Sequence, residues 1–391
     1  MCGNIDGYNC LYMKTILWLY NMPLVPEAGG TERITSLIRN GLLRRGYDCM
    51  KMLVVNPETE KITYEGELIH NLFEFLKKNN VDTIINQDGI TNKVLNVFLN
   101  KGGLRWQREG GKIITCLHFD PDAPSVIKLF LSKKTKTLKD WFIITKLQLL
   151  SSYYQNQKDN QAGKLYNELY DKSDSFVCLS KTHFAYLHKV MKRTSYEKMV
   201  AINNPLTFDD ISDISILGKK KKQVLIVARM DEFYKRISLA LKAWGFLQDI
   251  KDWRLVIVGD GPSLCDYKDY VQKNHLHNVC FEGRQTPETY YKDSSIFLMT
   301  SDKEGWGLTL TESLQRGVVP IVMDSCPVFS EIISDGVNGF LTPNNEIKKF
   351  ADKVRLLMTN HDILYKMEKQ ALVSASKFNI DNTIEQWEKI L

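Results

Sequence analysis

The chain has 391 residues, of which 43% are hydrophobic and 25% are charged, and its formal net charge is +6. That composition is typical of a globular protein with a large core, and the length suffices for two or three domains. The apolar runs stay short of the ~20 residues of a membrane-spanning helix, we expect no secretory signal, and the modest charge gives no indication of nucleic-acid binding.

The N-terminal stretch and the cysteines each support one expectation, the first about order and the second about the redox environment. Residues 1–12 are irregular and precede the strand-like MKTILWLYN, so we expect a disordered extension and a working start at Met13. The eight cysteines form neither CxxC pairs nor Cys/His clusters at zinc spacing. This scattered pattern of cysteines favours a reduced, cytoplasmic protein.

From Thr15 on, short apolar runs alternate with segments of helical periodicity, as in a parallel sheet covered by helices. The first strand is expected over 15–21, and a helix over 31–45 is ended by Gly46. Further strands are predicted over 49–55, 82–87, 112–118 and 175–180. These elements predict a first α/β domain over 13–206.

A basic segment lies inside this first half. Residues 126–150 hold six lysines against one aspartate, interleaved with aromatic side chains. Such a segment either lies on an anionic membrane surface, or forms a helix with a core-facing apolar side and solvated lysines. The one-sided charge favours the membrane, which would place the protein peripherally on the inner face of the plasma membrane.

The second half repeats the pattern after a polar linker over 207–223. Its strands are predicted over 224–229, 254–259, 278–283, 295–301 and 318–324. We expect a second α/β domain over 207–373 and an amphipathic final helix within 374–391, which either caps this domain or crosses back to the first. Two doubly wound domains leave a cleft where the carboxyl ends of their strands face each other, and open α/β sheets bind ligands there.

The stretch SDKEGWGLTLTES, residues 301–313, predicts an anion site in this cleft. Gly305 and Gly307 let the backbone approach a ligand closely. A helix starting at Leu308 adds its positive N-terminal end, so that the amides of residues 307–309 suit a phosphate.

Charged residues around this turn extend the site to a whole nucleotide sugar. Arg229 follows one strand and Lys235 lies shortly after it, within reach of a diphosphate held by the glycines. Glu304 and Glu312 stand at opposite ends of the turn. An acid beside a diphosphate is best explained by hydroxyl binding, so one acid would hold the sugar and the other the ribose.

In these residues the chain resembles the family 4 glycosyltransferases of the GT-B fold. The resemblance rests on 301–313 together with AGGTER (28–33), the Arg229/Lys235 pair, IVGDGP (257–262) and SDGVNGFLTP (334–343). It implies two Rossmann-like domains with a final helix that crosses back to the first. It also implies retaining transfer of a sugar from a nucleotide diphosphate, without a metal.

The resemblance assigns roles to individual residues. Glu312 matches the glutamate that holds the ribose hydroxyls, and Glu304 matches the one that contacts the donor sugar. Arg229 and Lys235 match the diphosphate cations. His118 matches a histidine that contacts the donor sugar near the anomeric carbon.

Further residues complete the expected donor site. Gly30 matches the glycine that lets the first domain close over the phosphate. Gly305, Trp306, Gly307, Leu308 and Thr309 form the phosphate turn, and Arg284 and Gln285 are expected to flank the base, which is uracil or guanine.

The chain departs from the family pattern at three positions. Ala228 and Arg236 stand where glycines are common, which could crowd the phosphate side, and Trp306 replaces a common phenylalanine. With no confident nucleophile in the sequence, we expect same-face substitution in which the leaving phosphate takes the proton of the acceptor.

Other classes of protein fit the sequence less well. Asp120-Pro121-Asp122 resembles the Asp-x-Asp metal site of the other major glycosyltransferase fold, but the double α/β pattern contradicts that fold. A glycoside hydrolase acting through Glu304 and Glu312 needs no phosphate turn, and AGGTER lacks the dinucleotide fingerprint of an oxidoreductase. A non-catalytic nucleotide-sugar-binding protein stays open. The acceptor is expected to be a glycan or a lipid-linked glycan, in polysaccharide or lipopolysaccharide synthesis.

Overall fold

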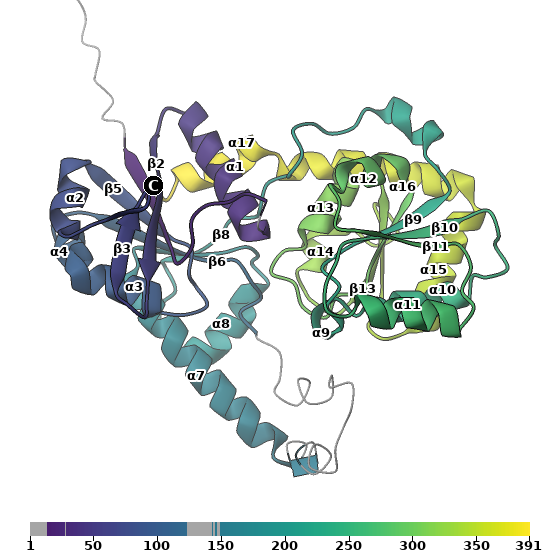
Figure 1. Ribbon diagram of the computed structural model, residues 1–391, viewed down its shortest axis with the longest axis horizontal. Coiled ribbons are helices and arrows are strands. Elements are labelled where there is room, and N and C mark those ends of the chain that lie inside the picture. The colour runs from purple at the N-terminus through teal and green to yellow at the C-terminus, as the bar shows by residue number, and fades with distance from the viewer. Residues whose placement is uncertain (1–13, 28, 123–142, 144, 147–148) are drawn as a thin grey trace, which may run out of the picture.

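The computed structural model describes residues 14–27, 29–122, 143, 145–146 and 149–391. It shows two α/β domains side by side, joined by two passages of the chain (Figure 1). The expected extension over residues 1–12 and all but a few residues of the basic segment 126–150 lie outside the described residues. None of the described helices is long and apolar enough to cross a membrane.

The first domain is built on an eight-stranded sheet in the order β4-β3-β2-β1-β5-β6-β7-β8. Its strands pair in parallel except for β3, which is antiparallel to β2 and to β4. The strands are β1 (Thr15–Tyr20), β2 (Asp48–Asn56), β3 (Lys61–Tyr64), β4 (Glu67–Leu68), β5 (Val81–Asn86), β6 (Lys112–Leu117), β7 (Ser175–Cys178) and β8 (Met199–Ala201).

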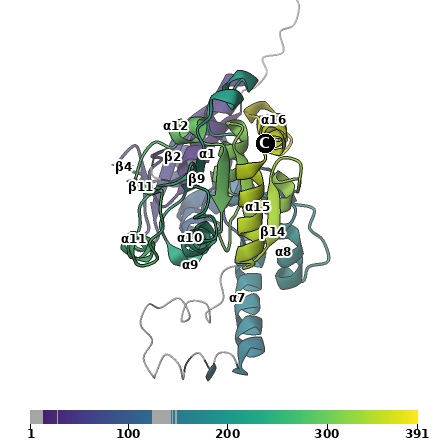
Figure 2. The ribbon, with the colours of Figure 1, turned by 90° about the vertical axis from the view of Figure 1, so that its right-hand side faces the viewer.

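Helices cover both faces of this sheet because the side chains of β1 alternate between them. Leu17 and Leu19 enter one core, and Ile16 and Trp18 enter the other. The helices of this domain are α1 (Gly30–Arg44), α2 (Leu72–Lys78), α3 (Lys93–Phe98), α4 (Leu104–Arg108), α7 (Ser151–Lys172) and α8 (His183–Met191), with a π-helical turn over Leu99–Gly103. Helix α7 projects from the body of the domain in both Figure 1 and Figure 2.

The second domain has a six-stranded, fully parallel sheet in the order β11-β10-β9-β12-β13-β14. The strands are β9 (Gln223–Val227), β10 (Arg254–Val258), β11 (Val279–Gly283), β12 (Ile296–Met299), β13 (Val319–Asp324) and β14 (Phe340–Pro343). The helices are α9 (Glu232–Lys235), α10 (Ile237–Gly245), α11 (Leu264–Lys273), α12 (Glu288–Asp293), α13 (Leu308–Gln315), α14 (Phe329–Ile332), α15 (Ile347–Thr359) and α16 (His361–Ala375), and 3-10 turns cover Ile214–Lys219 and Ser376–Phe378.

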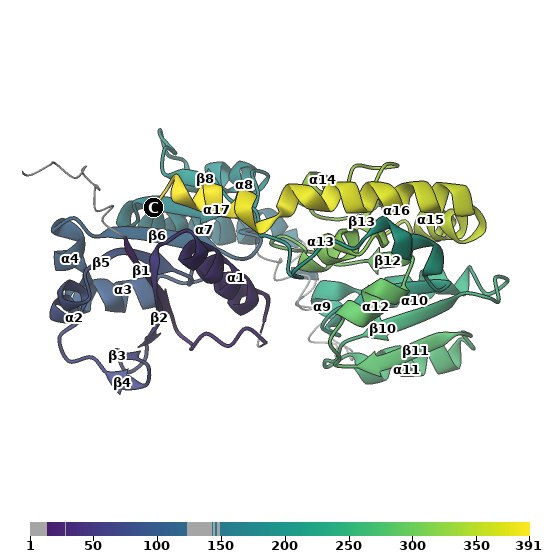
Figure 3. The same cartoon turned by 90° about the horizontal axis from the view of Figure 1, so that it is seen from above.

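The final helix, α17 (Ile380–Glu388), crosses back and packs on α1 of the first domain. Figure 3 shows α16 and α17 running along one side of both domains. The contact is close, because a Cβ atom added at Gly41 would lie 2.6 Å from Ile384 Cδ1. Lys14 Nζ also donates to the Leu391 carbonyl at 2.8 Å. Of the two placements that the sequence left open, the structure shows the crossing.

All ten predicted strands are present, but several end earlier than expected. Strand β9 ends at Val227 and β6 at Leu117, so Arg229 and His118 lie in the loops beyond their strands. The strand pairing of β9 with β10 stops at Val227, although the backbone amides of Ala228 and Met230 still donate to the carbonyl oxygens of Val258 and Asp260, at 3.1 and 2.8 Å.

Candidate active site

The residues predicted for the site lie around one cavity between the two domains, with a volume of about 780 Å³. This volume lies within the range of small-molecule sites. The first domain contributes Gly30 and His118. The second contributes Arg229, Lys235, Arg284, Gln285, Glu304, Gly305, Trp306, Gly307, Leu308, Thr309 and Glu312.

Two helices, one from each domain, begin at this cavity. Helix α1 follows Gly29 and helix α13 follows Gly307, and neither of these glycines can supply a side-chain cap. The helices nearly touch, because a Cβ atom added at Gly30 would lie 3.1 Å from Leu308 Cδ1. The first N–H groups of a helix lack intrahelical partners and carry a partial positive charge. Both helix ends therefore suit an anion in the cavity.

The turn needs a glycine at positions 305 and 307 for two different structural reasons. Gly307 has a φ of 99°, a left-handed conformation that favours glycine. A Cβ atom added at Gly305 would lie 2.7 Å from the Cα of Phe119 and 2.8 Å from the carbonyl oxygen of His118. Gly305 therefore lets the backbones of the two domains approach each other directly.

The expected cations differ in their contacts. Lys235 Nζ lies 2.5 Å from Glu304 Oε1, so these two side chains form an ion pair at the cavity wall. Arg229 is exposed, and its side chain has no hydrogen bond or ion pair within the part of the chain that the structure describes. An anion entering the cavity would meet Arg229 without displacing a partner from it.

Glu312 is buried at the opposite end of the turn, with an exposed side-chain fraction of 3%. Its Oε1 accepts from Arg33 Nη1 at 3.0 Å and from Thr207 Oγ1 at 2.8 Å, and its Oε2 accepts from the Tyr291 hydroxyl at 3.1 Å. Burial raises the pKa of Glu312 above its ordinary value, and Arg33 opposes that shift. The charge of this acid in the cleft therefore depends on its neighbours.

His118 directly follows β6, at the carboxyl end of the strands of the first sheet, and lies next to Gln87. Its Nε2 is hydrogen-bonded to Gln87 Oε1, which also accepts from Thr35 Oγ1 at 3.1 Å. Because the partner atom is an acceptor, Nε2 carries the hydrogen in this arrangement. Burial lowers the pKa of His118 to about 4. The imidazole is therefore neutral near pH 7 and adds no charge to the cavity.

Arg284 and Gln285 are exposed and follow β11 at one end of the cavity. Arg284 Nη2 donates to the carbonyl oxygen of Glu27, across the two domains, at 3.2 Å. Gln285 Nε2 donates to the carbonyl oxygen of Glu282 at 3.4 Å. Both side chains lie where a base could be flanked, but neither contact selects uracil over guanine.

Arg236 does not crowd the phosphate side, contrary to the expectation from the sequence. Its backbone is left-handed, with a φ of 48°, which explains why a glycine suits the position. The buried guanidinium points away from the cavity and donates to the carbonyl oxygens of Thr300 at 2.8 Å and Ser301 at 3.0 Å. It thereby supports the segment that leads to Glu304. Ala228, by contrast, lines the cavity.

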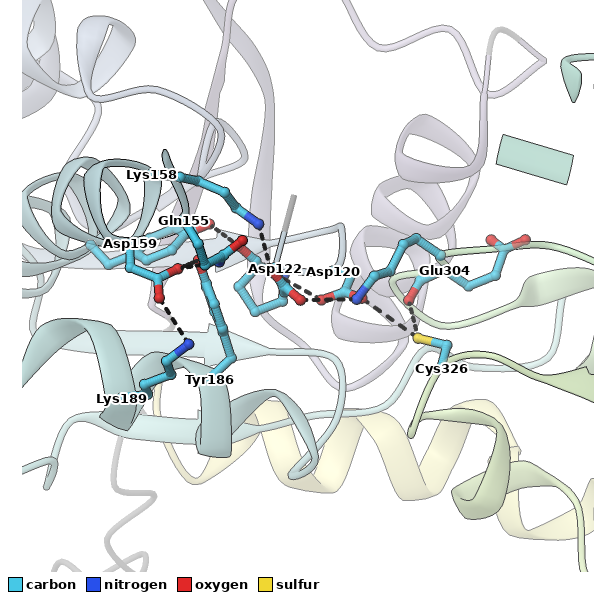
Figure 4. A network of polar contacts seen from close by, with 12 residues as sticks. Asp120, Asp122, Gln155, Lys158, Asp159, Tyr186, Lys189, Glu304 and Cys326 are labelled. Atoms are coloured by element: carbon cyan, nitrogen blue, oxygen red, sulfur yellow. Dashed lines mark hydrogen bonds and ion pairs between the residues drawn. The ribbon is translucent and has the colours of Figure 1, made fainter. Parts of the chain in front are cut away.

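Asp120 and Asp122 take part in ion pairs that join the domains. Lys303 Nζ lies 3.3 Å from Asp120 Oδ2 and 3.1 Å from Asp122 Oδ2, and Lys158 Nζ lies 2.6 Å from Asp122 Oδ1. Figure 4 shows the two aspartates between Lys158 on one side and Glu304 and Cys326 on the other. Among the described residues, no group of three or more His, Cys, Asp or Glu side chains could hold a metal ion.

The sequence reasoning missed several residues around Glu312. Arg33 could have been predicted, because it stands three positions after Gly30 in AGGTER and therefore lies on the same face of α1. Thr207 and Tyr291 carry no such local signal, since only the tertiary fold brings them to Glu312. Asn204 and Gly259 also line the cavity.

The second half of the chain matches a known family model. Residues 207–373 match the model described as Glycosyl transferases group 1. An uncharacterized glycosyltransferase of Haemophilus influenzae is 23% identical over 94% of this chain and 97% of its own length. The poly(glycerol-phosphate) alpha-glucosyltransferase of Bacillus subtilis is 26% identical over 50% of this chain, and the match spans 30% of that relative.

Solved structures resemble the whole chain in fold. The lipopolysaccharide outer core galactosyltransferase WaaB has a TM-score of 0.64 and 17% identity over 96% of this chain and 98% of its own. Anabaena HepE in complex with UDP has a TM-score of 0.64 and 15% identity over 96% of this chain and 99% of its own. The predicted GT-B fold is therefore confirmed. Together with the family model and the relatives, the fold and the cleft support a glycosyltransferase.

Proposed function

We propose that the protein is a retaining glycosyltransferase that moves a sugar from a nucleotide diphosphate to a glycan or a lipid-linked acceptor, without a metal. The observation that carries this proposal is one cavity at which two helices begin and which is lined by the cations Arg229 and Lys235 and the acids Glu304 and Glu312. The charge pattern follows a sugar, a diphosphate and a ribose in order. The UDP bound in HepE favours UDP over GDP as the nucleotide.

The chemical demand on such a site is to stabilise the departing nucleoside diphosphate. Preorganised donors aimed at a developing negative charge supply much of the rate enhancement in such sites. Here Arg229, Lys235 and the first amides of α13 take that part, so the reaction needs no metal for charge neutralisation. Because its pKa is about 4, His118 is neutral near pH 7, and no imidazolium is present there to act as a general acid. The leaving phosphate would accept the acceptor's proton on the same face of the sugar, which retains the configuration.

The acceptor side of the proposal rests on the relatives. The names of the matched proteins refer to poly(glycerol phosphate) and to the lipopolysaccharide outer core. An acceptor in cell-surface polysaccharide or lipopolysaccharide synthesis fits both. Peripheral attachment to an anionic membrane through residues 126–150 belongs to the proposal and rests on the charge of that segment.

Calorimetric titration with UDP and with GDP tests the donor site. We expect saturable binding of one nucleotide that persists in EDTA, and Arg229→Ala should weaken it about 10- to 100-fold by removing charge-assisted hydrogen bonds. Arg44→Ala on the exposed end of α1 is the matched control. If neither nucleotide binds, even with magnesium or an acceptor lipid present, the proposal fails.

A turnover assay separates the enzyme from a non-catalytic nucleotide-sugar-binding protein of the same fold. Release of the nucleoside diphosphate from a bound sugar donor, or transfer to an acceptor, supports the enzyme. Tight donor binding with neither reaction, across UDP- and GDP-sugars, would support the binding protein instead.

A further inference from the structure

Arg33 forms an ion pair that spans the cleft at the proposed ribose site. It lies on α1 of the first domain, and Glu312 lies on α13 of the second. Arg33 Nη1 and Glu312 Oε1 are 3.0 Å apart, and both residues line the cavity with Arg229 and Lys235. The Arg33 side chain is 38% exposed, whereas that of Glu312 is 3% exposed. The pair therefore joins the long, partly exposed side chain of Arg33 to the buried side chain of Glu312.

Glu312 has little room for a ribose while Arg33 stays on it. Each oxygen of a carboxylate accepts about two hydrogen bonds. Oε1 already accepts from Arg33 and Thr207, and Oε2 accepts from Tyr291. Tyr291 is fully buried and cannot move aside easily. One acceptor position of Oε2 stays open, but the two adjacent hydroxyls of a ribose need two. Arg33, with a side chain that is 38% exposed, is the donor that can leave toward the cavity to provide the second.

A diphosphate would offer the displaced guanidinium a better partner than Glu312. In a nucleotide the first phosphate is joined to the ribose through one methylene group, so it lies next to the position that Arg33 leaves. Guanidinium groups bind phosphates through paired hydrogen bonds, and a diphosphate carries more charge than one carboxylate. Arg33 also follows Gly30 by one turn, so it extends from the helix end that faces the anion.

We propose that Arg33 is a further diphosphate ligand, supplied by the first domain, which exchanges from Glu312 to the phosphates when the nucleotide's ribose takes its place on Glu312. This inference rests on the proposed function, because it requires a nucleoside diphosphate in the cavity. In the exchange a direct contact between the domains becomes a contact through the ligand. Nucleotide binding thus changes which groups hold the cleft together.

The test compares a nucleoside diphosphate with its nucleoside. Binding of UDP is measured by calorimetry and binding of uridine by ligand-observed NMR, for the wild type, Arg33→Gln and Arg44→Gln; GDP and guanosine replace them if the wild type prefers GDP. We expect Arg33→Gln to weaken UDP binding about 10- to 100-fold, as for lost charge-assisted hydrogen bonds. Uridine binding should stay equal or become tighter, because its competitor for Glu312 is gone. Arg44→Gln should change neither.

Two patterns would overturn the exchange. An equal loss for UDP and uridine would mean that Arg33 acts only by holding Glu312, and unchanged UDP binding would mean that it does not contact the phosphates. Thermal unfolding of Arg33→Gln shows that the variant is folded. If the wild type binds neither UDP nor GDP, the proposed function fails as a whole, which is distinct from either pattern.

Discussion

Individual residues in the cleft are arranged as pairs of opposite charge. Lys235 pairs with Glu304, and Arg33 pairs with Glu312, so the acids at both ends of the cavity are partly neutralised. Arg229 differs because it has no such partner among the described residues. A bound diphosphate would therefore meet Arg229 first and would compete with an acid for the other cations. The acids consequently affect nucleotide affinity as well as sugar binding.

Replacing Glu304 should separate these two effects. Glu304→Gln removes the carboxylate that we assign to the donor sugar, and it also frees Lys235 for the diphosphate. We expect UDP affinity to stay equal or rise, while sugar transfer falls about 100-fold, the usual scale for losing a preorganised polar group. Calorimetry with UDP and a transfer assay with the matching donor measure the two effects.

Glu58→Gln, at an exposed loop position of the first domain, is the control for removing one negative charge. A parallel loss of UDP affinity and transfer in Glu304→Gln would contradict the assignment, because it would make Glu304 a support of the phosphate site.

The neutral His118 predicts a stability change with pH. Burial lowers its pKa from 6.5 to about 4, so between these values the unfolded chain binds a proton that the folded chain does not. Stability is therefore fully present above pH 6.5 and is lost as the pH falls toward 4, by about 3 kcal/mol at most. Urea unfolding at several pH values should show a shallower dependence for His118→Gln.

The exposed His70 provides the comparison, since His70→Gln should keep the wild-type dependence on pH. Identical slopes for wild type and His118→Gln between pH 6.5 and 4 would show that His118 is solvated enough to charge in the folded protein.

At the scale of elements, most of the parallel strands were predictable, and the short strands toward the sheet edges were not. Strands such as β1 and β12 are buried on both faces and read as continuous apolar runs. Strand β4 has only two residues, both exposed, and β8 has only three, of which Met199 is buried, so neither gives a pattern that stands out from the flanking loops. Strand β14 lies within the glycine-containing stretch 334–343, whose sequence predicts no strand.

The same distinction applies to the site. The glycines, Arg229, Lys235 and both acids follow strand ends along the chain, so their order in the sequence places them at one edge of a sheet. The partners Gln87, Thr207 and Tyr291 come from distant segments, and only folding brings them to His118 and Glu312.

The turn before α13 allows a prediction about its two glycines. Gly305→Ala places a methyl group against the backbone of Phe119 and His118, so the domains must separate slightly. A misplacement of ~1 Å can cost about 100-fold in rate, and we expect transfer to fall strongly while thermal stability changes little. Gly307→Ala keeps that contact but forces a left-handed conformation, with a φ of 99°, at a cost of about 1–2 kcal/mol in stability.

Transfer assays and thermal unfolding distinguish the two variants. Gly336→Ala, with a φ of 73° and no neighbour within 4 Å, shows the effect of backbone strain alone. If Gly305→Ala keeps full transfer activity, the close approach of the two backbones is not required for the reaction.

On the scale of the whole molecule, ion pairs and hydrogen bonds join the domains around the cavity. Arg33 pairs with Glu312, Arg284 reaches the carbonyl of Glu27, and Ser180 Oγ donates to Glu331 Oε1 at 2.6 Å. The packing of α17 on α1 buries apolar side chains such as Ile384, and Arg45 at the end of α1 lies 3.5 Å from Asp381 of α17. A hinge around the contact between α17 and α1 would break these polar contacts at the cavity. Exposed pairs cost little free energy to break, whereas the pair with the buried Glu312 costs more.

Lys303 offers the sharpest test of this arrangement, because it contacts two aspartates of the first domain beside Glu304. The pKa of Asp122 is lowered: burial opposes the shift, and the ammonium groups of Lys158 and Lys303 outweigh it.

Lys303→Gln should loosen the cleft without unfolding either domain. We expect a larger radius of gyration in X-ray scattering and a UDP affinity that is weaker by about tenfold at most. Lys221→Gln breaks a comparable ion pair, with Asp293 at 2.6 Å, inside the second domain, and should change neither. If Lys303→Gln leaves both the scattering and the affinity at the wild-type values, the contact between Lys303 and the aspartates does not hold the cleft.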